Sequence, residues 1–384
     1  MILQIPLAWL ILVKERSRLL VAIAGIAFAV ILIFMQLGFM NALYDSATAP
    51  HRNLKADLVL LNPQSEVLFS LRSFPRIRLY QAQRVEGVEL VNFLYSRLGN
   101  WKNPQTRRTR SILMLGFDPS RPAFQFPGVN ENLEALKKPD RVIFDQLSRP
   151  EFGPIAETFQ NNQFVETEVN GTRIQVAGLF SMGTSFSADG HAITSDTTFL
   201  HIFKQSQQSQ IDLGLITLKS GFEPQKVIKE LSKALPNDVK VMTVDEFAAL
   251  EKNYWENSVA IGFIFGLGAF MGFIVGAVIV YQIIYTDVYN HLSEYATLKA
   301  MGYKHTYLLK IVLEESIILA FLGYIPGLLL SILMYIYLES ETQLPVMMTV
   351  DVAIFVLILA IIMCFVAGSI AMRKLNSADP ADIF

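Results

Sequence analysis

The sequence predicts a membrane protein with four transmembrane α-helices in a one-plus-three arrangement and a large extracytoplasmic α+β domain between the first and second helix. Of its 384 residues, 52% are hydrophobic and only 17% are charged, whereas a soluble domain carries about a quarter charged residues. The charge is also uneven, because residues 45–256 hold 24 basic and 24 acidic side chains. Outside that segment, four stretches have the length of about 20 apolar residues that a bilayer-spanning helix needs.

The first span is predicted at residues 19–44, which contain no charged side chain. Before it, residues 1–18 form a cytoplasmic or interfacial segment, of which 1–13 suit either a short helix along the inner membrane surface or a ragged start of the span. Residues 47–49 are Ala-Thr-Ala, a pattern found at signal-peptide cleavage sites. The apolar run is too long for a signal peptide and Pro50 follows directly, so we expect a retained helix.

Three further spans follow the inserted domain, at residues 257–286, 311–338 (uncharged over 316–338) and 352–372. Basic side chains flank the four spans on one side only, so the positive-inside rule places both termini in the cytoplasm and residues 45–256 outside an inner (plasma) membrane. These basic residues are Lys14, Arg16, Arg18, Lys299, Lys304, Lys310, Arg373 and Lys374. The same topology makes residues 287–310 and 373–384 cytoplasmic and residues 339–351 a short external loop.

The inserted domain carries the patterns of an α+β fold. Short apolar or alternating runs predict strands at 56–61, 111–117, 173–180, 213–218 and 239–243. An apolar stripe predicts a helix at 225–235, so residues 213–243 form a split βαβ-like unit. Residues 118–210 are rich in Pro, Asn, Gln and Gly and suit a second lobe inserted into the first.

A second helix is predicted directly after the split unit. Thr243 is a candidate N-cap, and Glu246 stands three positions later as its capping-box partner. Because no breaker follows, we expect this helix to run into the membrane through Trp255, so that motion passes rigidly between domain and membrane. The residues expected to carry this transmission are Val244, Phe247, Leu250 and Tyr254.

Glycines at four-residue spacing predict close helix packing in the membrane. The second span contains them at Gly262, Gly266, Gly268, Gly272 and Gly276. The first span is their expected partner, through Gly25, Ala29 and Gly38. In the third span, Gly323 and Gly327 flank Pro326 and indicate either a kink or another tight contact.

The sequence lacks the residue patterns of common catalytic and cofactor sites. The net charge of −2 argues against nucleic-acid binding, and the single cysteine, Cys364, has no thiol partner. No nucleotide-binding, metalloprotease or serine-hydrolase motif occurs, so we expect no catalytic residue, metal or cofactor in this chain. His191 beside Asp189 suits a surface turn better than a ligand pair. Glu314 and Glu315 suit contact with lipid headgroups better than a proton relay.

One basic segment could have a binding role. Residues 101–110 mix tryptophan with arginine and lysine, and could contact an anionic lipid headgroup or an acidic partner. A solvated hairpin loop is the interpretation we favour.

The loop between the second and third spans is the most specific feature. Ser293 can cap a short helix and Gly302 can end it, leaving an apolar face toward the cytoplasm. Residues 294–303, with the sequence EYATLKAMGY, resemble the inner loop of the FtsX/MacB-type permeases of ABC transporters. Residues 377–382 resemble the closing segment of that family, and residues 5–10 and 287–299 are most similar to its cyanobacterial DevC subfamily.

The resemblance implies a non-catalytic permease subunit. A separate ATPase, which binds ATP and Mg²⁺, would contact the inner loop. A periplasmic adaptor would contact the outer domain and lead to an outer-membrane channel, and the first two helices would form a homodimer interface within the membrane lipids. The residues that would couple to the ATPase are Leu292, Glu294, Tyr295, Leu298, Lys299, Ala300 and Gly302.

From this resemblance we expect an export system that moves a glycolipid or other hydrophobic substrate by transmitting ATP-driven motion. Two alternatives remain open at this point. One is a relative that extracts lipoproteins or signals without export, and the other is a membrane-anchored hydrolase acting outside the cell.

Overall fold

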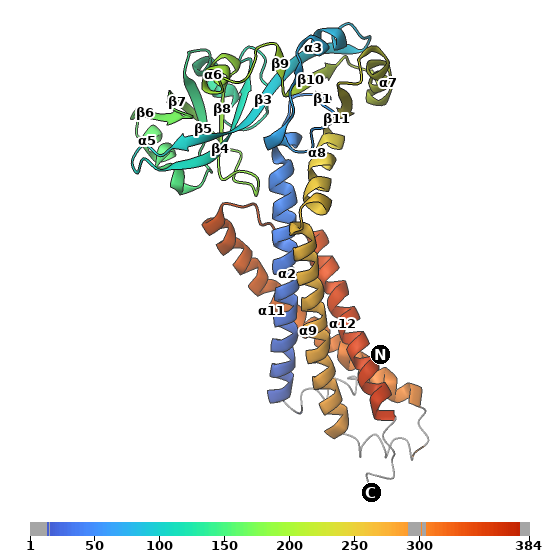
Figure 1. Cartoon of the computed structure of the whole chain (residues 1–384). Helices are drawn as coiled ribbons and strands as arrows, with labels where there is room; N and C mark the ends of the chain where they lie inside the picture. Colours follow the sequence, from blue (N-terminus) through green and yellow to red (C-terminus); the bar gives the residue numbers. More distant parts are fainter. Residues whose placement is uncertain (1–13, 15, 291–300, 302–304, 377–384) are drawn as a thin grey trace. The chain divides into compact units, whose positions relative to one another are not determined.

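The computed structural model describes residue 14, residues 16–290, residue 301 and residues 305–376 (Figure 1). The chain divides into two compact units. The helical unit comprises Met1–Asn41, Ile261–Leu338 and Val346–Phe384, and the inserted domain comprises Ala42–Ala260 and Glu339–Pro345.

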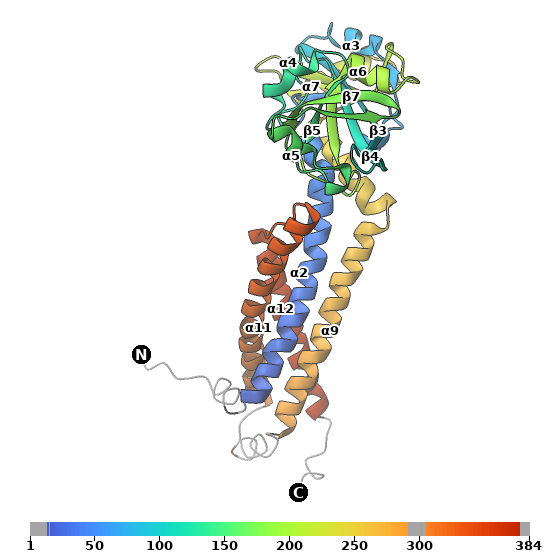
Figure 2. The same ribbon diagram turned by 90° about the vertical axis from the view of Figure 1, so that its left-hand side faces the viewer.

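Within the described ranges, the helical unit is built on four long helices, which confirms the predicted one-plus-three order (Figure 2). They are α2 (Arg16–Arg52), α9 (Ile261–Asn290), α11 (His305–Thr342) and α12 (Val350–Asn376). All four are long and apolar enough to cross a membrane. Large apolar side chains such as Phe263, Phe270 and Leu333 remain exposed, as expected of helices whose outer faces contact hydrocarbon rather than water.

The helix bounds differ from the predicted spans. The first helix, α2, continues to Arg52 instead of ending at Tyr44, and α9 starts at Ile261 instead of residue 257. Ala47 and Ala49 favour helix beyond the apolar run. Hydropathy alone therefore locates each span but not the ends of the helix that contains it.

The inserted domain is organised on a nine-stranded mixed sheet with the order β11-β1-β10-β3-β4-β8-β5-β7-β6. Its strands are β1 (Leu58–Leu61), β3 (Val88–Lys102), β4 (Thr109–Phe117), β5 (Arg141–Asp145), β6 (Val165–Val169), β7 (Thr172–Phe180), β8 (His191–Ser195), β10 (Leu213–Leu218) and β11 (Lys240–Thr243). A two-stranded sheet pairs β2 (Phe74–Pro75) with β9 (Gln210–Ile211). The α+β class is thereby confirmed.

Short helices connect and cover these strands. They are α3 (Ile77–Ala82), α4 (Leu133–Leu136), α5 (Ile155–Gln160), α6 (Asp196–Ile202), α7 (Pro224–Ala234) and α8 (Val244–Asn253). Single helical turns occur at η1 (Leu68–Ser70), η2 (Asn130–Asn132) and η3 (Pro150–Phe152), and a π-helical turn at η4 (Tyr254–Ser258).

The long strand β3 belongs to both halves of the sheet. Its first half pairs with β10 (Val91 opposite Ile216), and its second half pairs with β4 (Leu98 opposite Leu113). Its last residues also pair with β6, Trp101 lying opposite Val169. Strands β3, β4, β8, β5, β7 and β6 thus close into a ring, in which the second half of β3 and all of β4 join strands from the predicted lobe 118–210.

The predicted split unit is present in the other half of the sheet. Strands β10 and β11 both pair antiparallel with β1, one on each side, and α7 connects them. Val227 and Leu231 of α7 are buried, which is the stripe that the sequence predicted. This arrangement leaves β1 between two strands that come from the far end of the domain.

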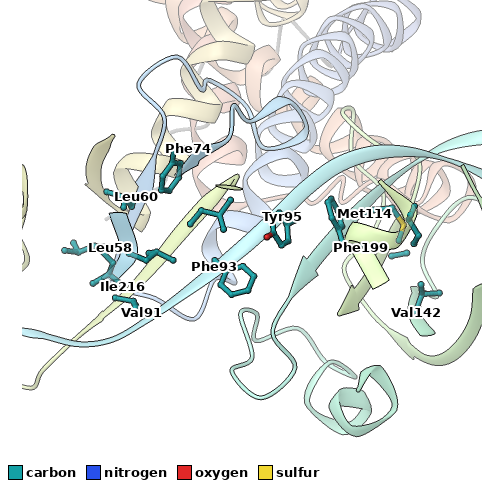
Figure 3. Packing of buried hydrophobic residues seen from close by; sticks show 14 of the residues in the cluster. Leu58, Leu60, Phe74, Val91, Phe93, Tyr95, Met114, Val142, Phe199 and Ile216 are labelled. Atoms are coloured by element: carbon teal, nitrogen blue, oxygen red, sulfur yellow. The ribbon is translucent and has the colours of Figure 1, made fainter. Parts of the chain in front are cut away.

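Two apolar clusters fill the domain. Figure 3 shows part of one cluster along β3, with Phe93 and Tyr95 between Ile216 on one side and Met114 and Phe199 on the other. The second cluster includes residues of β1, β4, β8 and α8, with Phe117 and Phe247 fully buried.

The basic segment 101–110 forms the β3–β4 hairpin, as favoured. Trp101 is fully buried and packs against Phe144 at 5.1 Å between ring centroids, so a headgroup contact for this side chain is wrong. Arg110 forms ion pairs with Glu151 (3.2 Å) and Asp189 (2.7 Å). These ion pairs connect the hairpin to η3 and to the loop before β8.

Candidate transmission site

Close packing brings most of the predicted glycines together with α2. A Cβ built on Gly276 would lie 2.6 Å from the Cβ of Ala29, and one on Gly272 would lie 3.2 Å from Ile33. A Cβ on Gly25 would lie 2.5 Å from the Ile279 side chain. Real Cβ atoms rarely approach so closely, so glycine at these positions is what lets α2 and α9 meet.

The other predicted glycines have different surroundings. Gly268 faces Gln36 of α2, and Gly262 is buried in α9. Gly266 has no described atom within 4 Å of its would-be Cβ, so it takes no part in packing within the described chain. Gly38 contacts Tyr335 of α11 rather than α9, which corrects its predicted partner. The reason is that α11 packs on another face of α2, which the spacing in α2 alone does not specify.

The glycines around Pro326 make a tight contact. A Cβ on Gly323 would lie 2.5 Å from Ile26, and one on Gly327 would lie 2.8 Å from Val30, both in α2. The helix continues through Pro326. Of the two possibilities left open, the structure therefore shows close packing.

The two carboxylates at the start of the third span differ in environment. Glu314 is partly exposed and lies 3.6 Å from Lys310. Glu315 is buried and hydrogen-bonds the side chain of Asp287, so headgroup contact is wrong for Glu315. Its partner comes from α9, and adjacency between distant helices was not visible in the sequence.

The helix expected to transmit motion begins as predicted. The Thr243 hydroxyl accepts a hydrogen bond from the Glu246 amide (3.1 Å), and the Glu246 carboxylate accepts one from the Thr243 amide (2.8 Å). Phe247 is buried in the second apolar cluster, and Val244 and Leu250 pack against that cluster. Tyr254 lies beyond α8, in η4, where its ring contacts Trp255 edge-on.

The prediction that α8 continues as one helix into the membrane is wrong. After α8 the chain forms the π-turn η4, and Val259 is extended (φ −117°, ψ 129°) before α9 starts at Ile261. Asn253, Asn257 and Ser258 precede the break, and the Asn257 side chain bonds the Asn253 side chain (2.6 Å). Such side chains compete with the helical backbone, which is the local signal that the prediction overlooked.

A buried polar cluster joins the end of α2 to α8. Glu251 accepts hydrogen bonds from the Leu68 amide (2.8 Å) and the Trp255 indole (3.0 Å). His51, near the end of α2, lies 3.5 Å from the same carboxylate and packs on Phe247 at 4.3 Å between ring centroids. His51 and Glu251 are almost completely buried. Burial raises the pKa of Glu251 to about 7.

Sequence reasoning missed this cluster, although one signal was available. Phe247, Glu251 and Trp255 recur at four-residue spacing, which places a carboxylate on the buried face of α8. An acidic residue on an apolar stripe needs hydrogen-bond donors once it is buried. His51 could not have been paired with it, because 199 intervening residues separate the two.

The predicted pair of His191 and Asp189 has structural roles. His191 is buried in β8, with Nδ1 at 3.4 Å from Asp145, so a surface turn is wrong for this residue. It starts a strand that pairs with β4, while Asp189 before it pairs with Arg110 and Arg149. Among the described residues, no group of three potential ligands could hold a metal ion.

The predicted coupling residues fall in a part of the chain outside the described residues. They are Leu292, Glu294, Tyr295, Leu298, Lys299, Ala300 and Gly302. Between residues 291 and 304 only Met301 is described, and it is exposed. The coupling assignment therefore stays a prediction.

Four apolar helices and a large α+β domain between the first two define a multi-span membrane protein. Two family models match successive parts of it: the MacB-like periplasmic core domain matches residues 19–234, and the FtsX-like permease C-terminal region matches residues 260–380. Because the first match covers more than half of the chain, the protein belongs to the MacB-like family of ABC-type permeases with FtsX-like C-terminal regions. The predicted FtsX/MacB resemblance is confirmed, and the DevC subfamily remains a prediction.

Two solved structures are also similar to the chain at low sequence identity. The periplasmic region of MacB from Actinobacillus actinomycetemcomitans is 11% identical with a TM-score of 0.35, covering 52% of this chain and 94% of that one. The extracellular domain of the noncanonic ABC-type transporter YknZ from Gram-positive bacteria is 12% identical with a TM-score of 0.31, covering 49% and 98%. No curated protein matches the chain.

Proposed function

We propose that this chain is the permease subunit of an ABC-type tripartite export system. A separate ATPase drives it from the cytoplasm, and the inserted domain acts outside the inner membrane on a hydrophobic cargo such as a glycolipid. A periplasmic adaptor and an outer-membrane channel complete the path. The chain supplies no catalytic group, and ATP and Mg²⁺ bind to the ATPase.

The buried cluster of His51, Phe247 and Glu251 is the observation that carries the proposal. It joins α2, which starts in the helical unit, to α8, which leads through η4 to α9. Displacing α2 or α8 would leave the buried Glu251 carboxylate without its hydrogen-bond donors or would expose Phe247. Either change costs free energy. Within the inserted domain, these two segments are therefore expected to move together.

A homodimer through the first two helices is part of the proposal. Gly266 and the exposed apolar residues Phe263, Leu267 and Phe270 share the open side of α9. Contiguous apolar surface with a small residue suits helix association in lipid. A second copy of the chain is the partner that we propose for this side.

Co-purification with the ATPase tests the proposal. Glu294→Lys and Ala300→Trp should each abolish capture of the ATPase by the full chain, because they change the charge and the shape of the proposed contact. Glu339→Lys, a charge reversal in the last turn of α11, is the matched control and should capture the ATPase normally. Normal capture by both inner-loop variants would rule out the coupling role.

Capture of the periplasmic adaptor distinguishes export from lipoprotein extraction or signalling. The wild-type chain should bind the adaptor in the absence of ATPase, since the inserted domain is the proposed contact. Binding of the ATPase without any adaptor would instead favour a permease that extracts or signals.

A further inference from the structure

A small polar cavity, partly open to the surface, lies in the inserted domain between β3 and the loop that follows α6. Its volume is about 70 Å³. It is lined by Ser73, Tyr95, Arg97, Gln205, Ser206, Gln207, Gln210 and Asp212. In contrast to the surrounding apolar cluster, every one of these side chains carries a hydrogen-bonding group.

Two hydroxyls in the lining are left unsatisfied. The oxygens of Tyr95 and Ser206 are buried and have no hydrogen-bond partner among the described residues. The Tyr95 ring is fixed by stacking on Phe199, at 5.1 Å between centroids. An unsatisfied buried hydroxyl costs about 1–3 kcal/mol, so two of them at one cavity indicate that something polar completes them.

A buried charge also borders the cavity. Asp212 is 1% exposed and accepts hydrogen bonds from the Ser73 hydroxyl (2.6 Å) and the Ser96 amide (3.0 Å). Arg97 lies 4.0 Å from this carboxylate and donates to Ser73 (3.3 Å). Asp212 and Arg97 thus form a charge pair in the cavity wall. Hydrogen bonds from Ser73 and Ser96 hold Asp212, and the hydrogen bond to Ser73 holds Arg97.

The chemistry of the lining selects a neutral ligand with hydroxyl groups. The Arg97 guanidinium opposes a metal cation, and the Asp212 carboxylate opposes an anion. Hydroxyl and amide groups, which both donate and accept, fit a ligand that does the same. At about 30 Å³ of liquid volume per water, the cavity admits the diol edge of a ligand, with the remainder outside among Gln205, Gln207 and Gln210.

We propose that this cavity binds the hydroxylated end of a neutral polyol, such as a sugar, and that its occupancy is transmitted to Glu251. The proposal concerns the inserted domain of this chain alone. It requires neither the ATPase nor the adaptor, so it stands or falls independently of the proposed function.

A continuous chain of hydrogen bonds supports the second half of the proposal. Asp212 bonds the Ser96 amide, and the Ser96 hydroxyl donates to the Leu68 carbonyl (2.6 Å). The amide of Leu68 in turn donates to Glu251, which also holds Trp255. A change at Asp212 therefore reaches α8 through groups that are all buried, although only measured coupling makes such a chain a pathway.

The test titrates the full chain in lipid nanodiscs with methyl β-D-glucopyranoside, following binding by calorimetry and the response by Trp255 fluorescence. Tyr95→Phe and Ser206→Ala each delete one hydroxyl and should weaken binding about three- to tenfold, the value of one hydrogen bond. Tyr80→Phe and Ser232→Ala remove exposed hydroxyls and are the matched controls, with no expected change. The Trp255→Phe variant identifies the part of the emission that belongs to this residue.

Ser96→Ala tests transmission separately, because Ser96 does not line the cavity. This variant should bind the probe within about twofold of the wild type but lose the Trp255 response. Absence of saturable binding, or equal binding by the Tyr95→Phe and Ser206→Ala variants, would overturn the polyol site. Binding without a Trp255 response in the wild type would overturn the link to Glu251.

Discussion

At the scale of single residues, Glu251 of α8 joins three other elements. Its carboxylate holds the Leu68 amide of η1 and the Trp255 indole of η4, and His51 of α2 lies beside it. Burial of the carboxylate raises its pKa from 4.5 to about 7. The folded domain therefore retains a proton on Glu251 at a pH where the unfolded chain has released it.

Two buried groups should give the stability of the domain opposite dependences on pH. Glu251, whose pKa is raised on folding, binds more protons in the folded state between about pH 4.5 and pH 7 and loses stability across that window. His51, whose pKa burial lowers from 6.5 to about 3, binds fewer protons in the folded state and gains stability as pH rises between about pH 3 and pH 6.5. The two contributions oppose each other between about pH 5 and pH 6.5, so thermal unfolding of the full chain in nanodiscs should show little slope in that range.

A variant that cannot titrate at Glu251 should reveal the His51 contribution. In Glu251→Gln the unfolding temperature should rise with pH between about pH 5 and pH 6.5, whereas Glu131→Gln, at an exposed glutamate, should behave as the wild type. A flat profile in Glu251→Gln would contradict the opposing contributions of the two residues.

At the scale of elements, the helices of the membrane unit meet through small residues. Glycine removes the side chain that would otherwise separate two backbones, and in lipid this close approach replaces the hydrophobic driving force. Gly276 and Gly266 lie on one helix but in opposite situations: the first is packed on Ala29, and the second is open in the described chain.

That contrast gives a matched pair of variants. Gly276→Ala should destabilise the packing of α9 against both α2 and α12 by about 1–3 kcal/mol through overpacking, because the added Cβ would meet the Met363 sulfur of α12 as well as the Cβ of Ala29. Gly266→Ala should be neutral or slightly stabilising in the monomer, since alanine favours helix. Thermal unfolding of the monomer in detergent compares them, and equal effects would contradict the observed packing.

Another element-scale prediction concerns the break between η4 and α9. Replacing Asn257, Ser258 and Val259 together by alanine should extend the helix, because all three are weaker helix formers than alanine. Amide hydrogen exchange at residues 259–261 should slow by about tenfold. Asn161→Ala, at an exposed asparagine outside this segment, should leave exchange there unaltered. Unchanged exchange in the triple variant would mean that side-chain competition does not cause the break.

Local patterns predicted several local features of this protein, although the local signal for the break after α8 was overlooked. The Thr243–Glu246 capping box and the α7 stripe depend on residues three or four positions apart, and both are present. Features that depend on distant partners were missed, including the burial of Glu315 beside Asp287 and closure of the strand ring at Trp101. Contacts of this kind are decided by tertiary packing, which a single sequence does not display.

At the scale of the whole molecule, the order of the spans and the distribution of charge predict an orientation. By the positive-inside rule we expect the inserted domain outside and the loop that contains Met301 inside. Met301 is exposed, and Lys137 offers an exposed position in the domain. These two positions allow a direct test.

Single cysteines should label from opposite sides of the membrane. In a Cys364→Ala background, Lys137→Cys should react with a membrane-impermeant maleimide in intact spheroplasts. Met301→Cys should react only after permeabilisation. Labelling of both positions in intact spheroplasts, or the reverse pattern, would refute the orientation.

The position of β1 has a consequence for how the domain is completed. This strand leaves the ribosome early, yet both of its neighbours, β10 and β11, lie more than 150 residues further along the chain. Strands of the ring can pair with close neighbours in the meantime, and local pairing is faster than distant pairing. An edge of β1 thus stays open until synthesis has passed Thr243, and the contact between His51 and Glu251 can form only after that. Assembly of the cluster therefore follows completion of the nine-stranded sheet.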